Sequence, residues 1–307
     1  MKIVFLVSSM NAGGAERVAA TLVNALADQG HDVTLLVCHP KKTPSAYALD
    51  ERVQLQHLLD ESPFLGLKFI GSAIKPFVLR QTLKRLQPDR IVSFLTNVNV
   101  VALVANWGLK RPIIVCERTH PTLNESSGKF LRVLRRLLYP RATAVVAQTE
   151  QSADVLRRLL PSQPRVHSIP NPLPPELLTL DKASGQPDAQ GRYQLVAMGR
   201  LVPSKQFDVL IRAFAAVAHN FPNWNLSIWG EGPLHASLQQ QIQQSGLQQR
   251  IQLMGHSKQA FQQLQQASAF VLTSRVEGFP NVLLEAMALG LPCISFDCPS
   301  GPAELSA

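Results

Sequence analysis

The stretch that decides the fold is residues 2–38, KIVFLVSSMNAGGAERVAATLVNALADQGHDVTLLVC. The apolar run 3–7 predicts a buried strand, and the periodic stretch 16–29 predicts an amphipathic helix that ends at Gly30. The apolar run 33–38 predicts a second strand. A strand, a helix and a second strand in this order predict a βαβ unit with parallel strands. The fold class is therefore α/β.

The same alternation of apolar runs and helical patterns continues to the end of the chain. A group of prolines between 170 and 175 and the polar stretch 181–192 interrupt it, which is typical of a linker. We expect two doubly wound, Rossmann-like domains, 1–180 and 181–307, that bind ligands in a cleft at the carboxyl ends of their strands. The further strands are expected at 91–95, 113–116, 144–147, 195–198, 226–229, 251–254, 270–273 and 293–296, and later helices begin near 205, 233, 258 and 281.

Composition excludes several classes of protein. The chain has 307 residues, of which 46% are hydrophobic and 17% charged, so it has enough apolar material for two cores and is not a disordered chain. No apolar run reaches the roughly 18 residues that a membrane-spanning helix needs. The four cysteines lack metal-ligand spacing, so we expect reduced thiols in a cytoplasmic protein: Cys38, Cys116, Cys293 and Cys298.

The formal net charge of +9 lies entirely in the first domain. Residues 1–180 hold 22 Lys and Arg against 13 Asp and Glu, whereas residues 181–307 hold 8 of each. Two stretches, 64–87 and 128–141, interleave cations with large apolar residues, and the second has five cations and no acid. Such helices lie on anionic membrane surfaces, although a soluble helix with a solvated basic face has the same pattern. No nucleic-acid motif is present, so we expect no nucleic-acid partner.

Two strand-to-helix turns carry groups suited to phosphate. In the first, Gly13 and Gly14 precede a helix, where a backbone without side chains can approach a ligand closely, although paired glycines also serve packing. In the second, Arg200 and Lys205 follow a strand, five residues apart, in a domain without net charge. Together they can neutralise a diphosphate as a divalent metal would; the alternative is two solvated surface charges.

The most specific signal is residues 277–285, Glu-Gly-Phe-Pro-Asn-Val-Leu-Leu-Glu. Glu277 precedes a predicted helix and Glu285 lies inside it. Carboxylates in such positions can accept hydrogen bonds from the hydroxyls of a sugar or ribose, while the N–H groups at the helix start point to the same ligand. The alternative, a helix capped by Asn281 with incidental acids, explains the intervening Gly-Phe-Pro-Asn poorly.

Taken in order, these segments make the chain resemble the retaining glycosyltransferases of family 4, which have the two-domain GT-B fold. The resemblance covers essentially the whole chain and rests on Gly13-Gly14, the Gly199-Arg200…Lys205 segment, Gly230-Glu231-Gly232-Pro233 and the 277–285 element. It implies an enzyme that moves a hexose or N-acetylhexosamine from a nucleotide sugar, with UDP favoured by frequency in the family. It also implies that no metal or other cofactor is needed.

The resemblance implies a role for each motif. Gly13 and Gly14 approach the donor diphosphate, and Arg200 and Lys205 bind it. Glu277 contacts the transferred sugar and Glu285 holds the ribose. The sugar hydroxyls meet the backbone of Phe279, Pro280, Asn281 and Val282. The acceptor hydroxyl attacks from the face that the nucleotide leaves, and a diphosphate oxygen takes its proton.

His120 follows a first-domain strand in Cys116-Glu117-Arg118-Thr119-His120-Pro121, where many family members keep a sugar-contacting residue. We predict that it contacts the transferred sugar or the acceptor; the alternative is a structural histidine. Arg118 is a comparable candidate for an anionic group of the acceptor. Together with the basic stretches, the resemblance favours a lipid-linked acceptor in the assembly of O-antigen, capsule, exopolysaccharide or lipopolysaccharide core. We expect a monomer on the inner face of the cytoplasmic membrane.

The chain stops at 299–307, Pro-Ser-Gly-Pro-Ala-Glu-Leu-Ser-Ala, where the family continues through a further strand and helices. The sequence therefore predicts a shortened second domain. Two alternatives stay open: a catalytically impaired remnant that still binds a nucleotide sugar at a membrane, and a GT-B epimerase or phosphorylase.

Overall fold

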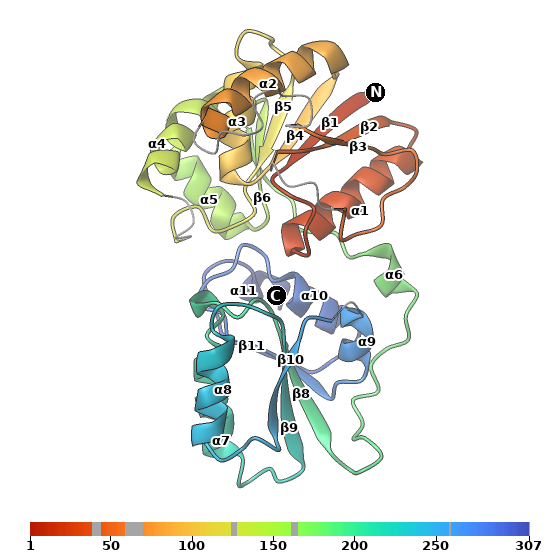
Figure 1. Ribbon diagram of the computed structural model, residues 1–307, viewed down its shortest axis with the longest axis vertical. Helices are drawn as coiled ribbons and strands as arrows, with labels where there is room; N and C mark the ends of the chain where they lie inside the picture. Colours follow the sequence, from red (N-terminus) through yellow and green to blue (C-terminus); the bar gives the residue numbers. More distant parts are fainter. Residues whose placement is uncertain (39–43, 59–69, 124–127, 161–164, 258, 307) are drawn as a thin grey trace. The chain divides into compact units, whose positions relative to one another are not determined.

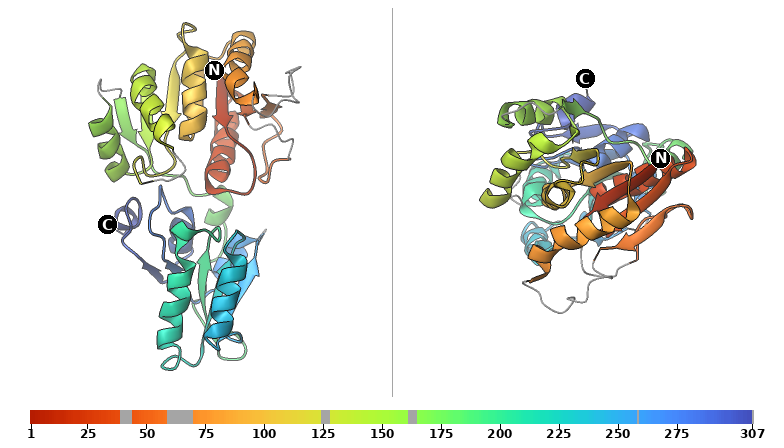
Figure 2. Two further views of the ribbon diagram at one scale, coloured as in Figure 1. Left: turned by 60° about the vertical axis from the view of Figure 1, so that its left-hand side comes forward. Right: turned by 90° about the horizontal axis from the view of Figure 1, so that it is seen from above.

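The computed structural model describes residues 1–38, 44–58, 70–123, 128–160, 165–257 and 259–306. The chain forms two compact units, Met1–Pro172 and Leu173–Ala307. The division comes somewhat before the one expected between 180 and 181, because Leu173, Leu177 and Leu180 pack into the core of the second unit. Both units have parallel sheets, with helices against the sheet faces (Figures 1 and 2).

The first unit has a seven-stranded sheet in the order β3-β2-β1-β4-β5-β6-β7, and every neighbouring pair is parallel. Its strands are β1 (Lys2–Val7), β2 (Asp32–Val37), β3 (Gln54–His57), β4 (Arg90–Phe94), β5 (Ile113–Cys116), β6 (Ala144–Ala147) and β7 (Arg165–Ser168). Its helices are α1 (Gly14–Asp28), α2 (Ile70–Leu86), α3 (Thr96–Asn106), α4 (Lys129–Leu138) and α5 (Glu150–Leu159), and a 3-10 turn, η1 (Tyr139–Arg141), follows α4.

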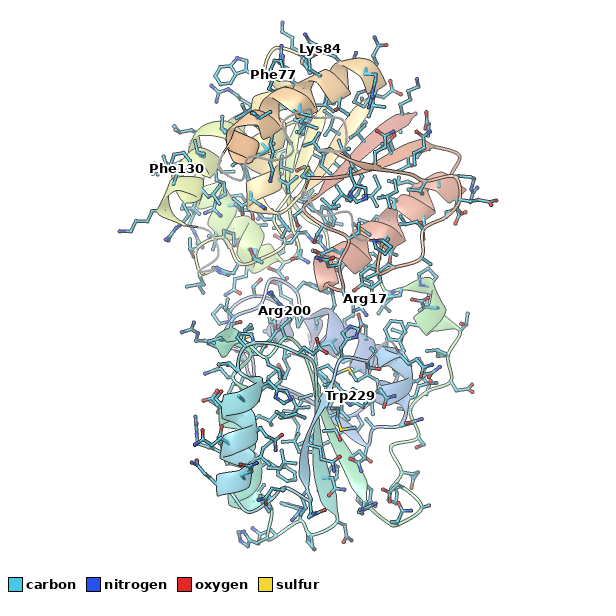
Figure 3. All side chains as sticks on the ribbon, in the orientation of Figure 1. Arg17, Phe77, Lys84, Phe130, Arg200 and Trp229 are labelled. Carbon is cyan, nitrogen blue, oxygen red and sulfur yellow. The ribbon has the colours of Figure 1, made fainter. Side chains whose placement is uncertain are left out.

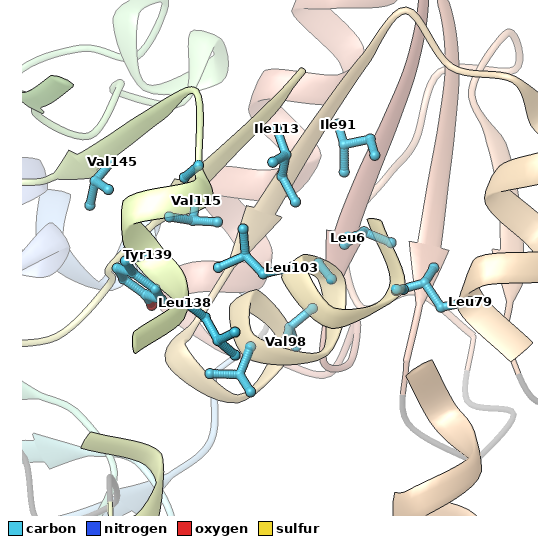
Figure 4. Close-up of a cluster of buried hydrophobic side chains, with 14 of the residues drawn as sticks. Leu6, Leu79, Ile91, Val98, Leu103, Ile113, Val115, Leu138, Tyr139 and Val145 are labelled. Atoms are coloured by element: carbon cyan, nitrogen blue, oxygen red, sulfur yellow. The ribbon is translucent and has the colours of Figure 1, made fainter. Parts of the chain in front are cut away.

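The sheet separates two cores because alternate residues of a strand point to opposite faces. Val4 and Leu6 of β1 join the core that α2, α3, α4 and α5 cover, which Figure 4 shows in close-up. Phe5 and Val7 of the same strand join the core under α1. The first unit is therefore wound on both faces, as the opening βαβ stretch predicts.

The second unit repeats this architecture on a smaller sheet, in the order β10-β9-β8-β11-β12. Its strands are β8 (Tyr193–Met198), β9 (Trp224–Trp229), β10 (Ile251–Gly255), β11 (Ala269–Leu272) and β12 (Cys293–Ser295). Its helices are α6 (Pro175–Leu178), α7 (Phe207–Val217), α8 (His235–Gln244), α9 (Ala260–Gln265), α10 (Asn281–Ala288) and α11 (Pro302–Leu305), and a 3-10 turn, η2 (Pro203–Lys205), precedes α7. Helices α7 and α8 cover one face of the sheet, and α6, α9 and α10 pack in the core on the other.

Every strand predicted from an apolar run is present, and β5 and β6 occupy the predicted residues. Two strands have no such prediction, β3 and β7, which are the edges of the first sheet. The helix expected near Lys205 begins at Phe207, after the turn η2 and with Gln206 in a left-handed conformation. The α/β fold with two doubly wound parallel sheets is confirmed.

Candidate active site

The strand order of the second sheet places a switch point beside β8. The chain leaves β8 for β9 on one side, and β11 pairs with β8 on the other. Where the chain connections of two neighbouring parallel strands run to opposite sides, a crevice remains at the carboxyl ends of the strands. Open α/β sheets bind ligands in this crevice. Arg200 and Lys205 follow β8, and Glu277 follows β11, so these candidates come from the two strands that flank the switch point.

Lys205 and Glu277 form an ion pair at this edge. The Lys205 Nζ and the Glu277 Oε1 are 2.5 Å apart, and their side chains are 21% and 11% exposed. Two further contacts join the same loops: Thr273 Oγ1 donates to the Lys205 carbonyl oxygen at 3.0 Å, and the Arg275 N–H donates to that of Ser204 at 2.8 Å. The structure thus brings together a cation and a carboxylate that are far apart in the sequence. Arg200 lies exposed on the turn between β8 and η2 (Figure 3).

The glycines of Gly230-Glu231-Gly232-Pro233 let the loop after β9 pack against the turn that carries Arg200. The Gly199 N–H donates to the Trp229 carbonyl oxygen at 2.9 Å, and the Leu201 N–H donates to that of Glu231 at 2.9 Å. A Cβ on Gly232 would lie 2.5 Å from the Leu201 carbonyl oxygen, and one on Gly230 would overlap the carbonyl oxygen of Gly199. This motif therefore positions the cationic turn through backbone contact.

Alanine at position 232 is expected to lower the free energy of unfolding by roughly 1–3 kcal/mol, because the added carbon meets backbone that has no space for it. Hydrogen exchange should also become faster in residues 199–205. The matched control is Gly128→Ala, since none of the described residues comes within 4 Å of a Cβ there. Equal urea midpoints for the two variants would contradict the packing role.

The Glu277 turn is held from its other side by the loop after β12. The Glu277 N–H donates to the Pro299 carbonyl oxygen at 3.2 Å, and Ser300 Oγ donates to that of Gly278 at 3.0 Å. Gly301 has a φ of 117°, and a Cβ there would meet the Pro280 ring. Residues 299–301 therefore support the segment that carries the carboxylate.

Helix α10 begins directly after this turn, at Asn281. The residue before it, Pro280, is the N-cap and makes no side-chain cap hydrogen bond, so Asn281 is the first residue of the helix and not its cap. Phe279 is 9% exposed and Glu285 2%, so both side chains are largely covered. Val282 is partly buried beside them.

In the first unit, Gly13 immediately precedes α1 and Gly14 is its first residue. Tyr47 Oη donates to the Gly13 carbonyl oxygen at 2.9 Å, and Ser9 Oγ donates to Glu16 Oε1 at 2.8 Å. The Glu16 carboxylate occupies the space that a side chain on Gly13 would take. The glycine turn is thus at a helix start, as predicted, with an acid packed over it.

His120 is 5% exposed, and its ring closes the following turn. Nδ1 lies 3.3 Å from the N–H groups of Thr122 and Leu123, which donate to it. This arrangement assigns the proton of the neutral ring to Nε2. Burial and, to a lesser extent, the charge of Arg135 lower the pKa of His120. The neutral ring therefore has one nitrogen engaged in the turn and one N–H as a donor.

A buried polar network surrounds Glu117, which no sequence prediction included. Tyr139 Oη donates to Glu117 Oε1 at 2.5 Å, and Thr96 Oγ1 donates to Oε2 at 2.8 Å. Asn99 Nδ2 lies 2.8 Å from Tyr139 Oη, and Arg135 Nη1 is 3.7 Å from Glu117 Oε1. None of the five residues is more than 6% exposed. A polar residue directly after an apolar strand, here Glu117 after β5, is the only sequence signal for this network.

Arg135 lies inside the first unit, contrary to the membrane-surface prediction for 128–141. The stretch 128–141 was predicted to present five cations to a membrane, but Arg135 is 4% exposed and faces Glu117. It cannot contact a lipid surface without breaking this pair. The outward residues of α4 are Lys129, Phe130, Arg132, Val133, Arg136 and Leu137. In the other basic stretch, 64–87, residues 64–69 lie outside the described residues, and α2 begins at Ile70.

Within the described ranges, no cluster of His, Cys, Asp and Glu could hold a metal ion, and no helix is both long and apolar enough to cross a bilayer. The predicted site residues divide between the units: Gly13, Gly14 and His120 belong to the first, and the others to the second.

Comparisons with known proteins agree with the architecture. The family model "Glycosyl transferase 4-like domain" matches residues 13–172, and "Glycosyl transferases group 1" matches 181–307. The chain is 29% identical, over 99% of its length, to GalNAc-alpha-(1->4)-GalNAc-alpha-(1->3)-diNAcBac-PP-undecaprenol alpha-1,4-N-acetyl-D-galactosaminyltransferase of Campylobacter jejuni, of which it covers 82%. It is also 29% identical, again over 99% of its length, to an exopolysaccharide phosphotransferase of Streptomyces coelicolor, but spans only 34% of that protein. The crystal structure of S. aureus TarM with UDP superposes with a TM-score of 0.79 at 12% identity, covering 99% of this chain and 87% of TarM.

Proposed function

This chain belongs to the glycosyl transferase 4-like family of glycosyltransferases, and on that premise we propose that it glycosylates a lipid-linked saccharide. The donor is a UDP-sugar that carries a hexose or N-acetylhexosamine, and the product belongs to a bacterial surface glycan. The observation that carries the proposal is the Lys205–Glu277 pair beside Arg200 at the switch point of the second sheet. The undecaprenol-linked acceptor in the name of the Campylobacter relative and the UDP bound to TarM support the choice of substrates.

In the proposed mechanism, the cations of the second unit stabilise the departing UDP. Negative charge grows on the diphosphate as the sugar leaves, and Arg200 and Lys205 are positively charged donors that follow β8 at the carboxyl edge of the sheet. Their positive charges take the role that a divalent metal has in other transferases. Because Lys205 is already paired with Glu277, its ammonium group is oriented before the donor binds.

Glu277 has two tasks in this proposal: it holds Lys205, and it accepts hydrogen bonds from hydroxyls of the transferred sugar. The backbone of Phe279, Pro280, Asn281 and Val282 contacts the same sugar, and Glu285 holds the ribose. The acceptor oxygen attacks from the side that UDP leaves, a diphosphate oxygen takes its proton, and the anomeric configuration is retained. In the first unit, Gly13 and Gly14 approach the diphosphate, and the N–H of His120 donates to the sugar or acceptor.

A donor panel tests this function. UDP- and GDP-sugars are offered with undecaprenyl-diphosphate-linked saccharides, and nucleotide release, product mass and anomeric coupling constants are measured. We expect one UDP-sugar to release UDP and to add one sugar with retained configuration. Release of nucleotide without a glycosylated product would favour an epimerase, phosphorylase or hydrolase, and binding of UDP without turnover would favour a non-catalytic remnant.

We also propose that the first unit lies on an anionic membrane through a basic apolar surface. This surface consists of the outward residues of α4 together with Phe77, Lys84, Trp107 and Arg141. Phe130 is 74% exposed, Phe77 63% and Trp107 59%, and Figure 3 shows Phe77 and Phe130 on the outside of α2 and α4. The Arg141 guanidinium stacks on the Trp107 ring at 4.5 Å, and Arg80 donates to the Trp107 carbonyl oxygen, so α2, α3 and η1 meet at this residue. The enzyme then acts as a monomer at the inner face of the cytoplasmic membrane.

The membrane proposal predicts that the protein co-sediments with phosphatidylglycerol vesicles and that salt releases it. Each of Arg132→Gln and Arg136→Gln should weaken binding roughly fivefold, since a cation near the surface contributes about 1 kcal/mol. Phe130→Ser should weaken binding further by removing apolar contact. The control is Phe221→Ser, a residue 52% exposed in the second unit, which should bind as wild type. Equal, salt-independent binding to neutral phosphatidylcholine vesicles would contradict the electrostatic account.

A further inference from the structure

Three polar side chains of the first unit lie at the carboxyl ends of three adjacent strands. Arg118 comes two residues after β5, Gln148 directly after β6 and Asn171 shortly after β7. Because the strands are parallel and paired in this order, the three residues share one edge of the sheet. We call them the Arg118 cluster.

Hydrogen bonds hold the cluster together. Arg118 Nη2 donates to Asn171 Oδ1 at 2.5 Å. Gln148 Nε2 donates to the same Asn171 oxygen at 2.8 Å; with the amide turned over, its nitrogen donates instead to the Arg118 carbonyl oxygen at 2.9 Å and its oxygen accepts from Arg118 Nη2 at 3.3 Å. Gln148 is 5% exposed and Asn171 7%, so both amides are fixed inside the unit. The guanidinium is therefore held in one orientation by two neutral groups.

The positive charge of Arg118 has no carboxylate to balance it. Its neighbour Glu117 is turned inward, where both carboxylate oxygens accept from Tyr139 and Thr96. Among the described residues, no acid lies within ion-pair distance of Arg118, and its Nε is buried without a hydrogen-bond partner. The Phe94 ring, 4.2 Å from the guanidinium carbon, provides a cation–π contact that offsets only part of the cost of desolvation. Burial lowers the pKa of Arg118 to about 10.

A desolvated, oriented and unbalanced guanidinium has the properties of a receptor for an oxyanion. Its planar donors match the two oxygens of a phosphoryl or carboxylate group, and such charge-assisted bonds are strong where water is excluded. Arg118 is itself partly exposed, so a ligand can reach it although Gln148 and Asn171 are buried.

We propose that the Arg118 cluster binds an oxyanion of the acceptor, either the diphosphate that joins its first sugar to the lipid or the carboxylate of an acidic sugar. The identification of the ligand as the acceptor rests on the proposed function. Arg118 is in this account a binding residue for the acceptor, and Gln148 and Asn171 are positioning residues that fix its guanidinium.

The test measures anion binding by titration calorimetry, with inorganic pyrophosphate and glucuronate as separate probes and with UDP at saturation to fill the donor site. Arg118→Gln is compared with wild type and with Arg165→Gln. The control also removes one positive charge, but at the first residue of β7, the end of that strand opposite to Asn171. We expect Arg118→Gln to weaken binding of one probe about tenfold or more, whereas Arg165→Gln should bind as wild type. Arg118→Lys keeps the charge but loses the planar donors, so its loss of probe affinity should be intermediate. This variant replaces Arg118→Gln in the test if the glutamine variant melts at a lower temperature than wild type.

The probe that depends on Arg118 identifies the source of the oxyanion: pyrophosphate indicates the lipid-linked diphosphate, and glucuronate indicates an acidic sugar. Two outcomes overturn the inference. In the first, Arg118→Gln binds both probes as tightly as wild type. In the second, Arg118→Gln weakens probe binding without UDP but not at saturating UDP, which would assign the site to the donor. Binding of UDP is measured separately in every variant. Its absence in the wild type contradicts the proposed function, whereas normal UDP binding without an effect of Arg118 contradicts this inference alone.

Discussion

Arg200→Gln is expected to lower the turnover of sugar transfer by about 10²–10³-fold, because one positively charged donor to the departing diphosphate is lost. Arg200 is exposed on the turn after β8, and the turn itself is held by backbone hydrogen bonds to the loop after β9. The substitution therefore removes the charge without disturbing the packing, and the melting temperature should stay at the wild-type value.

Lys205→Gln should reduce turnover by a similar factor, and it should also destabilise the second unit. It leaves the Glu277 carboxylate, 11% exposed, without its cation, so the unfolding free energy should also fall. Initial rates of UDP release and calorimetric UDP binding measure both variants. Arg212→Gln is the control, since Arg212 lies on α7 in an exposed pair with Asp208 that contributes little. Near-normal turnover in both Arg200→Gln and Lys205→Gln would refute the assignment of these cations to the leaving group.

Arg135→Met is expected to lower the free energy of unfolding of the first unit by about 3–5 kcal/mol, because it leaves the Glu117 carboxylate buried without a cation. Arg136→Met, one position along on the exposed side of α4, should change stability by no more than about 0.5 kcal/mol. Binding to anionic vesicles should weaken in Arg136→Met, because Arg136 faces outward. It should weaken less in Arg135→Met, because Arg135 faces inward.

A double-mutant cycle tests whether Arg135 stabilises the unit through its ion pair with Glu117. In a Glu117→Gln background no buried anion remains, so the further cost of Arg135→Met should shrink markedly. Urea unfolding gives the stabilities, and hydrogen exchange in residues 113–120 and 129–141 reports where protection is lost. Equal stability of Arg135→Met and Arg136→Met would show that the charge of Arg135 is not needed inside the unit.

Most strands could be predicted from the sequence because each contains an apolar run. β5 and β6 occupy the predicted residues for this reason. The edge strands β3 and β7, with the sequences Gln-Leu-Gln-His and Arg-Val-His-Ser, have a neighbour on one side only and contain few apolar residues. Their pairing is decided by the adjacent strand rather than by their own composition.

The candidate residues of the second unit could be named from their motifs, but their contacts could not. Lys205 and Glu277 were predicted to bind different parts of one donor, and only the pairing of β8 with β11 brings them together. Arg135 was misplaced for a related reason: a helical pattern of cations and apolar residues does not reveal which cation meets a buried acid from another element. Tertiary contacts of this kind depend on the topology of the whole sheet.

The two-sided character of α4 has a practical consequence for protein engineering. Arg135 and Leu138 face inward, whereas Phe130, Val133 and Leu137 are 74%, 57% and 59% exposed on the outer side. Replacing the outer three with polar residues leaves the inward contacts of the helix untouched. A variant of this design should stay folded and expose less apolar surface to solvent.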